Sequence, residues 1–279
     1  MDNIVRTAQA AKLQTSQFLD IPHILDANTT LNEKFNIQAS VTVADTDTIG
    51  LKYISIGNGG HTGTIGVNGV SKTVLRRHKP RHAALFNHLP FILRLQTDDL
   101  AAVERPKYRM RRFETHNGVA YVAYYLRLLD VSETQTRLEF RTVDNGVTTT
   151  TPYVPTLEDL NPVPDDLVSG GVLVTTGDYV AAVAKVSLAM TAEDMAELRN
   201  VCNIIYGDED YAMISEIALC SGVDRAVSGS FNGVTAGYTE AIGVQVMNFA
   251  QTSFFAKFNN TGIKLTYNVG AAEPLFELV

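Results

Sequence analysis

The chain has 279 residues, of which 45% are hydrophobic and 19% charged, and its formal net charge is -7. This length allows one large domain or two smaller ones, and the acidic balance excludes nucleic-acid binding by bulk charge. A charged share below the usual quarter favours large contact surfaces over a free monomer.

The N-terminal segment, the apolar runs and the cysteines indicate the compartment in which the chain is made. The segment MDNIVRTAQAAKLQTSQ has no apolar stretch with a small-residue cleavage site, so we expect no secretory signal. No apolar run reaches the roughly 18 residues that span a bilayer, so we expect a protein made in a cytoplasm, with no membrane partner. Cys202 and Cys220 stand in no ligand spacing and are expected to be reduced and buried.

The first half of the chain begins with a weakly helical segment and continues with strands. Residues 1–20 place apolar side chains on one helical face, and VTVADTD and LKYISIG follow with strand patterns. The segments YRMRRFETHNGVAYVAYYLRLLDV and TQTRLEFRTV predict a meander of antiparallel strands. Asn117-Gly118 and Asn145-Gly146 predict tight turns, since both turn positions need positive φ.

A proline-rich stretch divides the chain. Residues 147–170 hold four prolines and few large apolar side chains, which is typical of an extended connection. The sequence therefore predicts a β-rich domain over 1–150, a connection over 151–170 and an α+β domain over 171–279. One composite domain is the alternative.

The second half holds the clearest helix, at about 191–206. Thr191 is a good N-cap with Asp194 at the capping-box position, and Gly207 is a natural stop. Strands follow, including a hairpin with its turn at 259–262. There is no regular βαβα alternation, so we expect a mainly β or α+β fold with antiparallel, sandwich-like sheets.

The glycine-rich stretch GNGGHTGTIGVNG, residues 57–69, raises the question of phosphate binding. It lacks the lysine of a P-loop, and the glycine spacing of a dinucleotide site misses by one position. No helix is predicted after it to hold a phosphate. We expect a structural loop or hairpin tip, with Asn58 and His61 as candidates for contact with a partner.

No motif indicates catalysis, a cofactor or a metal. His78 and His82 are four residues apart, but Pro80 separates them and neighbouring cations would repel a metal ion. The sequence has no GxSxG motif, and its carboxylate pairs stand in turn-like polar stretches. We therefore expect no enzyme.

The basic segment is the one clear cluster of like charge in the sequence. From Lys72 to Arg112 there are eleven basic residues against three acids, so the rest of the chain carries -15. The segment contains RRHKPRH and RPKYRMRR, with Tyr108 and Phe113 as possible stacking partners for nucleic acid. Pairing with acids on neighbouring copies is the favoured alternative. The candidate interface residues are Arg76, Arg77, Lys79, Arg81, Arg105, Lys107, Arg109, Arg111 and Arg112.

Several stretches of the chain carry a family resemblance: LKYISIGNGG, LPFILRLQTDDLAAVERPKYRMRRF with VAYVAYYLRLLDV, NPVP, and YAMISEIALCSG with FFAKFNNTGIKLTYNV. In these stretches the chain resembles virion structural proteins of tailed bacteriophages. More narrowly, it looks like baseplate wedge proteins of contractile tails. The resemblance implies a β-rich subunit without catalytic residues, which assembles in several copies around the tail and binds neighbouring baseplate proteins.

The sequence thus predicts a virion subunit of the tail, assembled in the host cytoplasm. One alternative is a portal, neck or head-completion protein that contacts DNA through the basic segment. Another is a receptor- or glycan-binding module, although a chain without tryptophan lacks the usual stacking platform.

Overall fold

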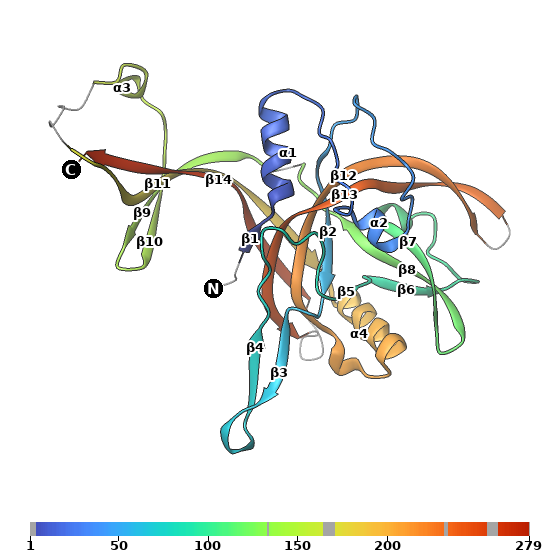
Figure 1. Cartoon of the computed structure of the whole chain (residues 1–279). Coiled ribbons are helices and arrows are strands. Elements are labelled where there is room, and N and C mark those ends of the chain that lie inside the picture. The colour runs from blue at the N-terminus through green and yellow to red at the C-terminus, as the bar shows by residue number, and fades with distance from the viewer. Residues whose placement is uncertain (1–3, 133, 164–170, 232–233, 256–261, 279) are drawn as a thin grey trace. The chain divides into compact units, whose positions relative to one another are not determined.

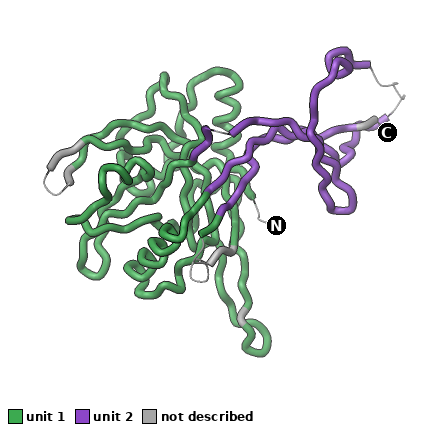
Figure 2. The backbone as a smooth tube through the Cα atoms, turned by 180° about the vertical axis from the view of Figure 1, so that it is seen from behind, with its two compact units in different colours: residues 1–129, 189–263 green, residues 130–188, 264–279 purple. Residues whose placement is uncertain are grey.

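A computed structural model describes residues 4–132, 134–163, 171–231, 234–255 and 262–278. The chain forms two compact units, each built from two separate stretches (Figure 2). The larger unit comprises Met1–Leu129 with Ala189–Ile263, and the smaller unit comprises Asp130–Leu188 with Lys264–Val279.

The larger unit contains most of the secondary structure (Figure 1). Its strands are β1 (Ile4–Arg6), β2 (Gly50–Gly57), β3 (His61–Ile65), β4 (Ser71–Leu75), β5 (His88–Leu89), β6 (Ile92–Leu95), β7 (Tyr108–His116), β8 (Val119–Leu128), β12 (Met213–Phe231) and β13 (Val234–Phe255). Its helices are α1 (Ala8–Phe18), α2 (Leu31–Phe35) and α4 (Ala192–Tyr206), with three short 3-10 turns at Val67–Gly69, Arg105–Lys107 and Glu209–Tyr211.

An eight-stranded antiparallel sheet forms the body of this unit. Its order is β1-β13-β12-β2-β8-β6, with β5 paired to β2 and β7 paired to β8. The backbone N–H groups of Met110 and Arg111 on β7 donate to the Glu240 carboxylate on β13, at 2.5 and 3.0 Å. Strands from opposite parts of the order therefore meet, and the sheet curls around one core.

The core contains side chains from both halves of the chain. They include Leu31, Tyr53, Met110 and Tyr125 from the first half and Val201, Val244 and Phe249 from the second. The mainly β architecture with antiparallel sheets is confirmed. The curling of the large sheet was not predicted. It follows from register shifts in β12 between Ile214 and Val223, because a bulge bends the strand that contains it.

The predicted helices are both present. Helix α4 begins with a capping box between Thr191 and Asp194 and ends at Gly207, which has a left-handed φ of 72°. Helix α1 covers much of the weakly helical N-terminal segment, and its N-cap Thr7 donates a hydrogen bond to the carbonyl of Val246 on β13 at 2.7 Å. The caps therefore fix both where these helices begin and what they contact.

Helix α2 was not predicted, and it fastens β13 through one buried amide. Asn32 Nδ2 donates to the carbonyls of Ile37 and Ala241 at 3.0 and 2.8 Å, and its Oδ1 accepts from the N–H of Val244 at 2.8 Å. On β13 this side chain satisfies backbone groups on either side of Gly243, which has a left-handed φ of 61° within the strand.

Both predicted tight turns are confirmed. Asn117 and Gly118 join β7 to β8, and Asn145 and Gly146 join β9 (Thr136–Asp144) to β10 (Val147–Pro152), all four with positive φ. The turn predicted at 259–262 falls mostly among residues 256–261, outside the described residues.

The smaller unit is a four-stranded antiparallel sheet in the order β10-β9-β11-β14. Its elements are β9 (Thr136–Asp144), β10 (Val147–Pro152), α3 (Leu157–Leu160), β11 (Leu173–Met190) and β14 (Ile263–Leu278). The connection predicted at 151–170 therefore falls within this unit, because β9 pairs with β10 before it and with β11 after it. Residues 164–170 of that connection lie outside the described residues.

Among the helices of the described residues, none is long and apolar enough to cross a membrane.

Candidate functional site: a buried carboxylate in the glycine loop

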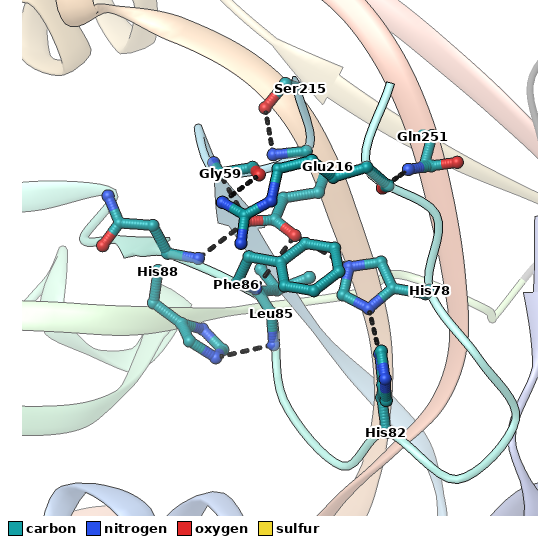
Figure 3. Close-up of polar contacts among 12 residues, drawn as sticks. Gly59, His78, His82, Leu85, Phe86, His88, Ser215, Glu216 and Gln251 are labelled. Atoms are coloured by element: carbon teal, nitrogen blue, oxygen red, sulfur yellow. Dashed lines mark hydrogen bonds and ion pairs between the residues drawn. The ribbon is translucent and has the colours of Figure 1, made fainter. Parts of the chain in front are cut away.

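The glycine-rich loop encloses an anion that belongs to the chain itself. The N–H of Gly59 donates to Glu216 Oε1 at 3.0 Å, and the N–H of Gly60 donates to Ser215 Oγ at 2.9 Å (Figure 3). Glu216 and Ser215 lie on β12, the strand that pairs with β2 just before the loop. The loop therefore binds an internal carboxylate with backbone donors, much as other loops bind phosphate.

Four donors surround the Glu216 carboxylate, whose side chain is 0% exposed. Besides Gly59, the N–H of Asn87 donates to Oε1 at 2.9 Å and that of Phe86 donates to Oε2 at 3.0 Å. His78 Nε2 lies 2.8 Å from Oε2. A carboxylate with this many donors is stable as a buried charge.

His78 is the side-chain partner of this carboxylate. Its ring is stacked between Phe86 and Phe249, with centroids 4.2 and 3.9 Å away, and its side chain is 0% exposed. The N–H of Lys79 donates to His82 Nδ1, so that nitrogen is an acceptor, and His78 Nδ1 lies 3.2 Å from it. His78 thus contacts Glu216 through Nε2 and His82 through Nδ1, while both faces of its ring pack on aromatic rings.

The glycines are required by close approach of the backbone. A Cβ atom on Gly57 would lie 2.3 Å from the carbonyl oxygen of Asn87, and one on Gly60 would lie 2.5 Å from that of Ser215. A Cβ on Gly59 would lie 2.6 Å from the Asn87 nitrogen. Only glycine fits at these three positions, which confirms a structural loop with its own specific ligand.

This arrangement fastens three distant segments rather than exposing a reactive group. It joins the loop after β2, residues 76–88 and β12, and Gln251 on β13 adds a hydrogen bond to the carbonyl of Arg76. Since Glu216 and His78 have no exposed side-chain surface, a substrate in solvent does not reach either group.

A second histidine, His88, forms a hydrogen bond with Ser55 whose direction is opposite to the one that nucleophilic catalysis needs. The N–H of Leu85 donates to His88 Nε2 at 3.1 Å, so the ring proton sits on Nδ1 and is donated to Ser55 Oγ at 2.9 Å. A general base must instead accept the serine proton. Burial lowers the pKa of His88 to about 3, and Lys34 and His78 add smaller effects.

We expect His88 to make the fold acid-sensitive. The pKa of His88 in the folded chain lies below the unfolded value of about 6.5. Between these two pH values the unfolded chain binds a proton on this ring and the folded chain does not. Stability is therefore complete above pH 6.5 and falls towards pH 3, by at most about 1.4 kcal/mol for each pH unit.

Urea denaturation between pH 7 and pH 4 measures this effect. His88→Gln keeps one donor and one acceptor but does not titrate, so its stability should fall less steeply with pH. Equal slopes for the two proteins would contradict the assignment.

The histidine pair considered for metal binding makes a different contact. The Nδ1 atoms of His78 and His82 lie 3.2 Å apart and form a hydrogen bond, and Nε2 of His78 contacts Glu216. Within the described ranges, no group of three or more His, Cys, Asp or Glu residues is placed to hold a metal ion.

The basic segment divides into a buried part and an exposed part. Arg109 and Arg111 are buried, at 4% and 8% exposure, and pair with Asp224 and Asp99 of the same chain at 2.8 and 3.0 Å. They therefore do not lie on an exposed contact surface, contrary to their place among the interface candidates. Arg112 pairs with Glu114 at 3.2 Å while remaining partly exposed.

The other interface candidates are more accessible. Arg105 is half-buried and donates to the carbonyl of Leu100 at 2.8 Å. Arg76 lies 4.4 Å from the ring centre of Phe86, and its side chain remains exposed. The remaining exposed cations are Arg77, Lys79, Arg81 and Lys107.

The two loop candidates are held by the larger unit. Asn58 Nδ2 donates to the carbonyl of Tyr211 at 3.1 Å, and its Oδ1 accepts from Asn87 Nδ2 at 2.6 Å. His61 is half-buried, and burial lowers its pKa. Asn58 therefore positions the loop, and His61 starts the hairpin that follows it.

Sequence reasoning missed the residue at the centre of the site. Glu216 is the single acid within the apolar strand YAMISEIALC, and a lone acid among core residues is a signal for a buried, partnered charge. Its partners come from residues 59–87, however, and nothing in the local pattern names them.

Cys202 and Cys220 are free and fully buried, as predicted. Burial raises the pKa of the Cys202 thiol to about 12 and that of Cys220 further still. We expect neither thiol to react with Ellman's reagent in the folded protein and both to react after denaturation. Rapid labelling of the folded chain would contradict this burial.

Comparison with known proteins gives a family and no function. The chain belongs to the family described as "Family of unknown function (DUF7208)", which it matches over residues 1–278. No curated protein and no solved structure matches the chain.

Proposed function

We propose that the chain is a structural subunit of a tailed-bacteriophage virion, placed in the tail baseplate, and that it works by binding neighbouring protein subunits. The sequence resemblance to baseplate wedge proteins supports the location. The observation that carries the binding role is the β3–β4 hairpin, which extends away from the rest of the larger unit (Figure 1).

This hairpin exposes aliphatic side chains that its own unit does not cover. Ile65, Val67 and Val70 are 83%, 85% and 67% exposed, and Val74 and Leu75, on opposite faces of the hairpin, are 39% and 51% exposed. Scattered exposed apolar residues are ordinary, but five on one short projection form a contact surface. A subunit of a large assembly buries such a surface against its neighbour.

The interior of the larger unit supports the same role. Its polar constellation around Glu216 is closed to solvent and joins distant segments, so it stiffens the body that carries the hairpin. A rigid body with projecting contact elements suits a subunit that locks to its neighbours and moves with them when the tail contracts.

A second candidate function rests on the exposed cations of residues 76–81. Arg77, Lys79 and Arg81 are exposed, which favours phosphate contact and hence a portal, neck or head-completion protein on DNA. A binding titration with duplex DNA at low salt tests it. Binding that weakens steeply with salt would support this candidate, and its absence at low salt would remove it.

Immunogold electron microscopy of virions from the source phage tests the proposed location. An antibody against this chain should label the end of the tail where the baseplate lies. Label at the neck or head would favour the DNA-contacting alternative, and label on the tips of tail fibres would favour the receptor- or glycan-binding module. Virions without label would overturn the proposal.

A further inference from the structure

We propose that copies of this chain join head to tail, with residues 61–81 of one copy docking on the sheet of the smaller unit in the next copy. We call residues 61–81 the arm. They comprise the β3–β4 hairpin and the basic stretch after it. This inference rests on the proposed role as an assembly subunit and names the partner as a second copy.

The arm combines aliphatic side chains with unbalanced positive charge. It contains five basic residues and no acid. The register places Lys72 and Val74 on one face of the hairpin and Ile65 and Leu75 on the other, so both faces carry aliphatic side chains. The arm therefore fits a surface that is both apolar and acidic.

The sheet of the smaller unit has one apolar face. Cross-strand pairs place Phe140 beside Val180 and Leu138 beside Ala182, and side-chain alternation puts Val147 of β10 on this same face. Val147 is 67% exposed and Leu138 is 36% exposed. We call this surface the receiving face.

On the opposite face of the same sheet, the charged side chains already pair with one another. Glu139 is buried there and accepts hydrogen bonds from Arg137 and Arg141, at 2.6 and 2.7 Å. Arg141 also lies 5.8 Å from the ring centre of Tyr179. The polar face has its partners within the sheet, so the apolar receiving face is the one that needs a cover.

Charge complementarity points to a second copy as that cover. The two stretches of the smaller unit contain eleven acids and four basic residues, a net charge of -7 that equals the charge of the whole chain. The larger unit carries nineteen of each sign, with its five arm cations concentrated in residues 61–81. Opposite charge steers the two surfaces of neighbouring copies together.

The edge of the smaller sheet favours the same contact. Strand β10 ends the sheet order, and its six residues, VTTTTP, are all exposed and uncharged. Edge strands that must stay free usually carry lysine or another charge. Because the arm and the receiving face are different surfaces, their contact repeats from copy to copy, and it closes into a ring or grows into a filament.

Cross-linking between two differently tagged variants tests this contact. Val67→Cys places a thiol at the arm tip and Val147→Cys places one on the receiving face, while both native cysteines are buried. With a short bismaleimide, the mixed variants should give a covalent dimer of the two tags, and each variant alone should give none. Val103→Cys, 81% exposed and outside the arm, is the matched control and should not cross-link to Val147→Cys.

Three results would overturn the proposal. These are no mixed dimer, equal cross-linking from the Val103→Cys control, and dimers of Val67→Cys with itself, which would indicate a symmetric contact. None of them bears on where the chain lies in a virion, so failure here is distinguishable from failure of the immunogold test.

Charge reversal gives a second readout. Arg77→Glu, Lys79→Glu and Arg81→Glu together should weaken self-association at least tenfold, with an unchanged circular dichroism spectrum because these side chains are exposed. Adding Asp144→Lys and Glu158→Lys in the smaller unit should restore part of the loss. Unchanged association of the triple variant would contradict the role of charge.

Discussion

Replacing Glu216 with glutamine should lower the free energy of unfolding by about 3–5 kcal/mol, the usual cost of breaking a buried ion pair from one side. The glutamine amide presents only one acceptor oxygen to a site with four donors, and its NH₂ group faces backbone N–H groups. The His78 ring would lose its carboxylate partner. Urea denaturation at pH 7 measures the change.

Glu209→Gln is the control for this experiment. Glu209 is exposed in the 3-10 turn before β12, so its replacement should change stability by less than about 0.5 kcal/mol. A loss below about 1 kcal/mol for Glu216→Gln would show that the carboxylate does not hold the loop.

Gly60→Ala should destabilise the fold by about 1–3 kcal/mol, the usual cost of forcing an added methyl group into packed structure. The new Cβ would meet the Ser215 carbonyl oxygen at 2.5 Å, and a backbone atom cannot rotate away. The same shift would weaken the hydrogen bond from Gly60 to Ser215 Oγ.

Gly63→Ala provides a matched comparison only three residues away. Nothing lies within 4 Å of a Cβ at Gly63, so this variant should be as stable as the unmodified chain or slightly more stable. Thermal and urea unfolding of the two variants side by side measure the difference. Equal stability would contradict the close packing of the loop against β12.

Local signals in the sequence predicted the local structure well. The Asn-Gly pairs need positive φ at both positions and have it, and the cap residues Thr191 and Gly207 bound helix α4 as expected. Each of these features depends on residues a few positions apart. Sequence patterns of that range therefore fix turns, caps and strand type.

The sequence pattern did not predict which distant segments of the chain pair with each other. The smaller unit joins residues 130–188 to 264–279, and proline composition alone placed the division at 151–170. Glu216 likewise binds donors about 130 to 157 positions away. A charge count also treats every arginine alike, although Arg109 and Arg111 turn inward to Asp224 and Asp99.

Light scattering on the purified chain after size-exclusion chromatography, at low and high salt, tests whether copies of the chain assemble with one another. We expect a discrete oligomer that loosens as salt screens the contact between the arm and the smaller unit, since exposed charges interact over only about 10 Å at 0.1 M salt. Deletion of residues 61–75 should give a monomer. A full-length chain that remains monomeric at every salt concentration would contradict assembly through copies of itself.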